Sequence, residues 1–146
     1  MNKEVIIRKI FAEDLDKIYE IEQECFENPY PLSFLHVLYT VNKDTFLVAD
    51  NVGQIVGYVI AADGRNLGNI VSIAVIHSKR WKGIGSNLMR EILRILASKG
   101  TKTVRLEVRK SNINAHRFYE LLDFKRSHII DKYYGNEDAV VYLKQM

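Results

Sequence analysis

Cysteine and proline are scarce in this sequence: its 146 residues include one cysteine, Cys25, and two prolines. A lone cysteine excludes an internal disulfide and a cysteine-based zinc site, so Cys25 is expected to be a small, buried, apolar side chain. No apolar run approaches the roughly 20 residues that cross a bilayer. The N-terminal residues Met1 to Glu4 lead into no signal-peptide pattern. We therefore expect a cytoplasmic chain without a membrane partner.

A strong excess of one charge is also missing, because 21 Lys and Arg residues face 18 Asp and Glu residues, a formal net charge of +3. One phosphate-rich ligand can balance that excess, and no face interleaves basic and aromatic residues as a nucleic-acid binder does. The four histidines share no ligand spacing, so no metal is expected. A content of 47% apolar and 27% charged residues is typical of a soluble globular protein. The length fits a single domain, residues 1–146.

Alternating and helical apolar periodicities predict an α/β fold with an α+β mixed sheet. Strands are expected at residues 5–9, 45–49, 55–61, 70–76, 103–108, 124–131 and 139–143. Helices are expected at residues 12–26, 31–39, 84–96 and 114–122. The order β-α-α-β-β-β-α-β-α-β-β implies a mixed sheet with helices on both of its faces.

A basic turn with two glycines, Gly83 and Gly85, separates the apolar run 70–76 from the helix that begins at Ile84. Such a turn points unpaired main-chain N–H groups and the positive end of the helix dipole at one small volume. It lacks the Gly-Lys-Ser/Thr ending of a nucleoside-triphosphate loop and the third glycine of a dinucleotide fingerprint. Many short Gly-x-Gly pairs are only turns. With the basic residues around it, this one predicts a phosphate site.

The motif Arg80-x-x-Gly83-x-Gly85 after an apolar strand resembles the pyrophosphate-binding turn of the GNAT superfamily of acetyl-coenzyme A-dependent N-acetyltransferases. Three further segments resemble its protein N-terminal, RimI-like (ribosomal-protein-alanine) branch: residues 106–112, 115–120 and 133–139. The resemblance spans nearly the whole chain. It implies a GNAT-like fold whose central sheet is splayed, and acetyl-CoA as the co-substrate, without a metal.

The same resemblance implies two proton-transfer residues, Glu107 and Tyr119. A carboxylate at Glu107, acting directly or through water, can deprotonate an N-terminal amine, whose pKa is about 8. A phenol at Tyr119, with an ordinary pKa of about 10, can protonate a departing thiolate. Alternatively, Glu107 is only a strand carboxylate paired with Arg105 or Arg109, and Tyr119 serves packing alone.

The implied binding residues fall into two groups. For acetyl-CoA, the main chain of three strand residues would pair with the pantetheine arm, the turn would hold the diphosphate, and Asn112 would cap the next helix and also bond the arm. These donor residues are Ile73, Ala74, Val75, Arg80, Trp81, Lys82, Gly83, Ile84, Gly85, Ser86 and Asn112. For the acceptor, the resemblance implies two aromatic walls formed by Glu27, Tyr30, Tyr133 and Tyr134.

Two departures from the family pattern carry structural expectations. The family's usual proline after the central strand is missing, and Ile76-His77-Ser78 stands in its place. The lack of this proline is expected to loosen the phosphate turn. Asp123 stands where relatives usually have glycine. Aspartate tolerates left-handed geometry better than most residues, so this turn is expected to survive.

These observations predict a protein N-α-acetyltransferase, in which the amine attacks acetyl-CoA directly within a ternary complex. A ribosomal protein is one expected target, and a monomer or weak homodimer is the expected state. Two alternatives stay open: an acetyltransferase for a small-molecule amine on the same fold, and a non-catalytic CoA-binding module. The accepted N-terminal residues are not apparent from the sequence.

Overall fold

The computed structural model describes residues 4–146, so Met1 to Lys3, part of the N-terminal stretch considered above, lie outside the described residues. Within the described part, the strands form one sheet in the order β1-β2-β3-β4-β5-β7-β6. The strands are β1 (Val5–Lys9), β2 (Phe46–Asn51), β3 (Gln54–Asp63), β4 (Leu67–Val75), β5 (Thr103–Arg109), β6 (Lys125–Ile130) and β7 (Ala139–Gln145). The α-helices are α1 (Leu15–Cys25), α2 (Leu32–Val41), α3 (Ile84–Ser98) and α4 (Ile113–Leu121).

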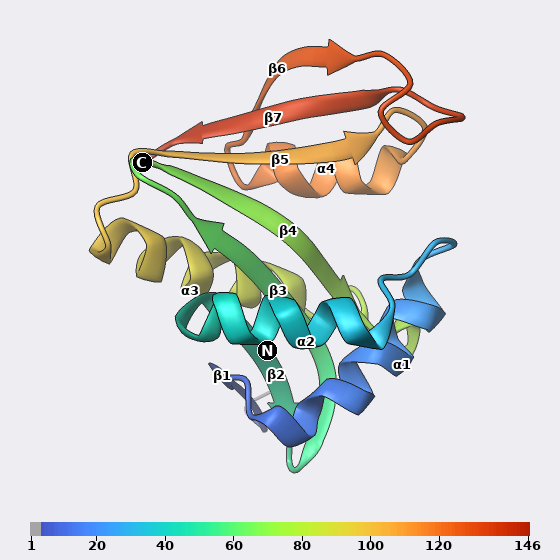
Figure 1. Ribbon diagram of the computed structural model, residues 1–146, viewed down its shortest axis with the longest axis vertical. Coiled ribbons are helices and arrows are strands. Elements are labelled where there is room, and N and C mark those ends of the chain that lie inside the picture. The colour runs from blue at the N-terminus through green and yellow to red at the C-terminus, as the bar shows by residue number, and fades with distance from the viewer. Residues whose placement is uncertain (1–3) are drawn as a thin grey trace.

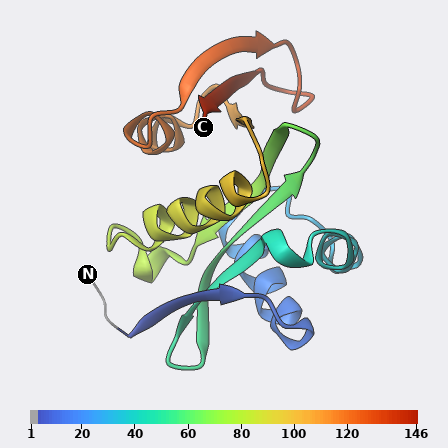
Figure 2. The ribbon, with the colours of Figure 1, turned by 90° about the vertical axis from the view of Figure 1, so that its left-hand side faces the viewer.

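Helices cover both faces of the sheet, as predicted (Figure 2). One apolar cluster joins α1 and α2 to one face of β2 and β3, through residues such as Ile18, Leu35 and Tyr58. A second cluster joins α3 and β5 to the opposite face, through residues such as Leu88 and Leu106. Each helix therefore buries its apolar stripe against a pleated surface whose side chains alternate between two cores.

The sheet is splayed in its middle. β4 and β5 pair in parallel only from Leu67 to Asn69, whereas β5 pairs with β7 along its whole length, from Thr103 to Arg109. Beyond Asn69 the two central strands diverge, with β1–β4 on one side of the opening and β5, β7 and β6 on the other (Figure 1). The splay implied by the family resemblance is thereby confirmed.

Three local expectations can be compared with the structure. Asp123 has a left-handed φ of 67°, as predicted. The second helix begins at Leu32 and ends at Val41, so Pro31 precedes the first helical residue and caps the helix; the predicted range was too early at both ends. Cys25 is half-buried and polar in its contacts, since its Sγ donates to the carbonyl of Val75 at 3.5 Å. The prediction of a buried, apolar Cys25 is confirmed only in part, because Cys25 packs against the apolar cluster of α1 and α2 but is not fully buried.

Among the described residues, no α-helix is both long enough and apolar enough to cross a bilayer.

Candidate active site

A cavity of about 390 Å³ opens where β4 and β5 separate. Its walls come from the end of α1 and the following loop, from β4, β5 and α4, and from the loop between β6 and β7. Eight residues predicted for the site line this one cavity: Glu27, Tyr30, Ile73, Glu107, Asn112, Tyr119, Tyr133 and Tyr134. Segments distant in the sequence therefore converge where the sheet opens.

Glu107 lies on β5 and lines the cavity, as do its neighbours Leu106 and Val108, which are almost fully buried. Its Oε2 accepts a hydrogen bond of 2.6 Å from Nε of Arg105, and its side chain is 13% exposed. The alternative pairing considered from the sequence is therefore present. It does not occupy the whole carboxylate, because Oε1 has no hydrogen-bond partner among residues 4–146. A proton acceptor can be held by Arg105 through one oxygen and act through the other.

Tyr119 reaches the cavity from α4, where its ring contacts those of Phe118, Phe124 and Tyr142. Burial, and to a smaller extent Tyr134, raises the pKa of the Tyr119 phenol above its ordinary value. The hydroxyl makes no hydrogen bond with any residue from 4 to 146. Packing fixes the Tyr119 ring, which agrees with part of the alternative that Tyr119 serves packing alone. It nevertheless leaves a protonated hydroxyl that can donate a hydrogen bond into the cavity.

The turn before α3 presents a row of free main-chain donors. Within the described chain, the N–H groups of residues 81–86 donate no hydrogen bond, and the first bond of the helix runs from Asn87 N to Gly83 O. Trp81 and Gly83 both have positive φ, 65° and 83°, and a Cβ built on Gly83 would meet no atom within 4 Å. Such a concave row of donors at the start of a helix suits the oxygens of a diphosphate.

The basic side chains of this turn do not all point at that row. Arg80 donates from Nε to the carbonyl of Val75 at 2.9 Å and from its Nη2 to Sγ of Cys25 at 3.4 Å. Arg80 therefore ties the turn to the ends of β4 and α1. His77 adds a second tie, since its main-chain N–H donates to Glu24 at 2.7 Å. These contacts tie the turn to α1 and β4, and the loosening expected from the missing proline stays a prediction.

The edge of β4 that faces the opening also carries free main-chain groups. Ile76 N donates to Val56 O at 2.9 Å, which makes that pair a hydrogen-bonded one in the antiparallel ladder with β3. By alternation, the main chain of Ala74 faces β3, whereas the N–H groups of Ile73 and Val75 face away from it. β5 has already left that edge. Of the three predicted residues, Ile73 and Val75 thus offer groups to a ligand and Ala74 does not.

Asn112 occupies the N-cap of α4, where its side chain accepts a hydrogen bond of 3.2 Å from Ala115 N. The predicted capping role is confirmed. The side chain also lines the cavity.

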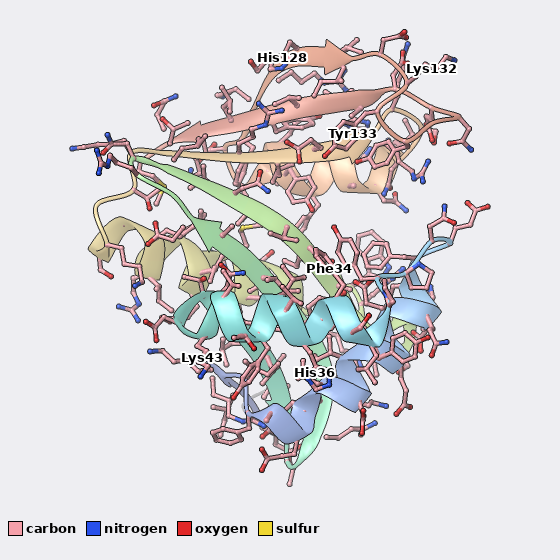
Figure 3. The ribbon with its side chains drawn as sticks, in the orientation of Figure 1. Phe34, His36, Lys43, His128, Lys132 and Tyr133 are labelled. Atoms are coloured by element: carbon pink, nitrogen blue, oxygen red, sulfur yellow. The ribbon has the colours of Figure 1, made fainter. Side chains whose placement is uncertain are left out.

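Aromatic side chains stand on two sides of the cavity. Tyr30 packs on Phe34 with ring centroids 5.0 Å apart, and Tyr133 packs on Tyr134 at the same distance. Phe34 of α2 and Tyr133 belong to the two parts of the molecule on either side of the opening (Figure 3). Burial, followed by Tyr133 and the negative charge of Glu107, raises the pKa of Tyr134 to about 12. Both walls thus offer neutral phenols that can hydrogen-bond an extended peptide.

Two acidic residues that support the walls were not among the predicted site residues. Glu137 accepts from Ser111 N at 2.6 Å and from Arg109 at 3.4 Å, so it ties the loop that bears Tyr133 and Tyr134 to the start of α4. Glu22, 2% exposed, lies on α1 and lines the cavity. The position of a glutamate on the apolar side of the first predicted helix was the available signal for it.

Comparisons with known proteins agree with this architecture. Residues 15–124 match the family described as Acetyltransferase (GNAT) family. The chain is 36% identical to an N-terminal acetyltransferase complex ARD1 subunit homolog of Dictyostelium discoideum, over 96% of this chain and 74% of that protein. It is 31% identical to a [ribosomal protein bS18]-alanine N-acetyltransferase of Haemophilus influenzae, over 93% and 95%.

A solved structure gives the same result for the fold. The crystal structure of Ard1 from Thermoplasma volcanium superposes with a TM-score of 0.94 at 26% identity, covering 98% of both chains. The splayed sheet, the donor-rich turn and the family match therefore agree, and the chain belongs to the GNAT family of acetyltransferases.

Proposed function

We propose that this protein transfers the acetyl group of acetyl-CoA to the N-terminal α-amine of a protein or peptide. The observation that carries the proposal is the cavity beside the free edge of β4, which contains both Glu107 and Tyr119, while the turn that follows β4 bears the free N–H groups of residues 81–86. The names of the relatives, which are N-terminal and ribosomal-protein-alanine acetyltransferases, support the choice of acceptor.

The donor site is assigned to this chain's own groups. The free N–H groups of residues 81–86 would hold the diphosphate, and Lys82 adds positive charge. The N–H groups of Ile73 and Val75, with the Asn112 side chain, would hold the pantetheine arm. Acetyl-CoA supplies an activated acetyl group as a thioester. An N–H of β4 beside it would stabilise the charge that develops on the carbonyl oxygen.

The chemistry then needs three proton transfers. Glu107 accepts a proton from the acceptor ammonium, directly or through water, which leaves a nucleophilic amine. The amine forms the new C–N bond at the thioester carbonyl, the C–S bond breaks, and Tyr119 donates its proton to the departing sulfur. The attacking nitrogen then gives its surplus proton to the Tyr119 oxygen, directly or through water, and Glu107 releases its own proton to solvent. Because both reactants are held in one cavity, much of the rate comes from their alignment. No acyl-enzyme intermediate is needed.

The acceptor would enter between Tyr30 and Glu27 on one side and Tyr133 and Tyr134 on the other. A ribosomal protein as target, a cytoplasmic location, a monomer or weak homodimer, and one acetyltransferase domain over residues 1–146 remain predictions. Three glutamates, Glu22, Glu27 and Glu107, line the cavity, and their charge favours a cationic amine over an anionic acceptor.

The test is mass spectrometry of peptides incubated with the protein and acetyl-CoA, using a small library varied at the first two positions. The proposal predicts acetylation at the α-amine. Acetylation confined to lysine side chains or to free polyamines would move the acceptor to another class. Tight CoA binding by calorimetry, with no turnover on any peptide and no effect of Glu107→Gln, would establish the non-catalytic alternative.

A further inference from the structure

Glu22 lies at the centre of a buried polar cluster beside the cavity. Its Oε1 accepts a hydrogen bond of 2.8 Å from the main-chain N–H of Tyr30. Its Oε2 accepts one from the Tyr58 hydroxyl and one of 3.2 Å from Oγ of Ser72. All three donors are neutral, and the residue is 2% exposed. Burying a carboxylate without a cationic partner costs free energy that bonds from neutral donors offset only in part, so this arrangement calls for a reason beyond stability.

The three donors come from places that shape the cavity. Ser72 pairs with Ile60 of β3, but the next pair is Ile70 with Ala61, so Val71 is an extra residue in β4. Pairing of β4 with β5 stops at Asn69, immediately before this bulge. Bulges bend a strand and release its partner. Glu22 therefore fastens α1 to the point where β4 leaves β5 and the cavity begins.

The third donor belongs to the predicted acceptor wall. In the segment from Glu27 to Tyr30, the Tyr30 N–H is the one main-chain group with a hydrogen bond inside residues 4–146. The loop is otherwise fixed by its ends, at the close of α1 and at Pro31 before α2, and by the ring contact of Tyr30 with Phe34. The position of the Tyr30 main chain against the cavity thus depends on one side chain, Glu22.

We propose that Glu22 is a positioning residue for the acceptor. Its carboxylate holds the loop of Tyr30 in the conformation that receives the peptide, and it couples that loop to the bulge in β4. The inference rests on the proposed function for its kinetic consequences. It assigns Glu22 no proton transfer, because its oxygens already accept three hydrogen bonds, whereas Glu107 keeps a free oxygen.

The substitutions that test this are Glu22→Ala and Glu22→Gln. Alanine removes the bond to Tyr30, whereas the glutamine carbonyl can still accept it and the glutamine NH₂ can donate to a hydroxyl of the cluster. For Glu22→Ala we expect the KM for the acceptor peptide to rise by about tenfold or more, with the KM for acetyl-CoA changed less than about twofold. Glu22→Gln should restore most of the loss.

Tyr58→Phe is the matched control, because it removes one buried hydrogen bond of the cluster and leaves the bond between Glu22 and Tyr30 in place. It should lower the Tm and leave the acceptor KM within about threefold of wild type. An acceptor KM raised as much in Tyr58→Phe as in Glu22→Ala would show general loss of packing and overturn the proposal. So would an acceptor KM raised as much in Glu22→Gln as in Glu22→Ala, because Glu22 would then act through its charge.

A second measurement does not depend on catalysis. Hydrogen exchange of segment 26–31 should be faster in Glu22→Ala than in wild type and near wild type in Glu22→Gln, with no substrate present. Unchanged exchange in Glu22→Ala overturns the proposal even if the kinetics change. If wild-type protein acetylates no peptide, the proposed function fails, and the exchange result still decides whether Glu22 holds the loop. If Glu22→Ala does not fold, the wild-type protein still decides: the Tyr30 amide should exchange more slowly than the amides of Glu27 and Asn28, and equal rates overturn the proposal.

Discussion

Replacing Glu107 with glutamine tests the proton acceptor at the centre of the cavity. Gln has nearly the same shape and keeps an oxygen that can accept from Nε of Arg105, now 2.6 Å from the carboxylate. What it loses is the ability to take up a proton. Positioned general bases contribute roughly 10²- to 10⁴-fold to rate, so we expect kcat to fall by about that factor.

The cost in stability should be small by comparison. Arg105 is 32% exposed, so water can replace part of the lost charge-assisted bond. The free energy of unfolding should therefore fall by about 1 kcal/mol or less. The predicted signature is a large loss of kcat with nearly unchanged Tm, peptide KM and acetyl-CoA KM.

The assay is steady-state kinetics with a peptide substrate and acetyl-CoA from pH 6 to 9. The wild-type rate should rise with pH toward the pKa of the amine, about 8, and the deficit of the variant should be largest at pH 6 and narrow toward pH 9, where the amine arrives already deprotonated. Glu91→Gln is the matched control, since Glu91 pairs with Arg94 on α3 and is absent from the cavity lining. A loss of kcat below about threefold in Glu107→Gln would refute the assignment and indicate that alignment alone supplies the rate.

Three further changes have defined outcomes. Gly83→Ala forces a side chain into a φ of 83°, at a cost of roughly 1–2 kcal/mol, and should lower the affinity for acetyl-CoA about tenfold. The affinity can be measured in a titration followed by the fluorescence of Trp81, the sole tryptophan. An unchanged affinity would contradict a role for this turn. Asn112→Ala removes the cap of α4, so stability should fall by about 1 kcal/mol, and an unchanged Tm in thermal unfolding would contradict this. Burial raises the pKa of Tyr119, so its contribution to stability is complete below about pH 10 and is lost above it at up to about 1.4 kcal/mol per pH unit. Urea unfolding from pH 8 to 11 should show a shallower slope in Tyr119→Phe, and an identical slope would count against the raised pKa.

Much of the fold follows from periodicity, because the strands and helices alternate with clear turn residues between them. The left-handed Asp123 and the capping Asn112 were also predictable, since both depend on local geometry. The family resemblance located eight of the residues that line the cavity. Their convergence depends on β4 leaving β5 after Asn69, which no local pattern specifies.

The side-chain contacts between segments distant in the sequence could not be predicted. Glu22 meets Tyr58 and Ser72 across 36 and 50 positions of sequence, so helical spacing explains its burial and not its partners. Arg80 has a charge that suits phosphate, yet its guanidinium bonds Val75 and Cys25. Charge type alone predicted attraction to an anion, whereas the direction of the side chain is set by tertiary packing.

The most direct test concerns the main-chain donors at the start of α3. In ¹⁵N–¹H spectra of the protein titrated with acetyl-CoA, the amide resonances of residues 81–86 should shift saturably, because those N–H groups have no partner within the described chain and would acquire the diphosphate oxygens. S-acetylpantetheine, which lacks the diphosphate, should leave them in place while shifting Ile73 and Val75. Amides of residues 81–86 that stay unmoved by saturating acetyl-CoA, or that move equally with S-acetylpantetheine, would contradict the account.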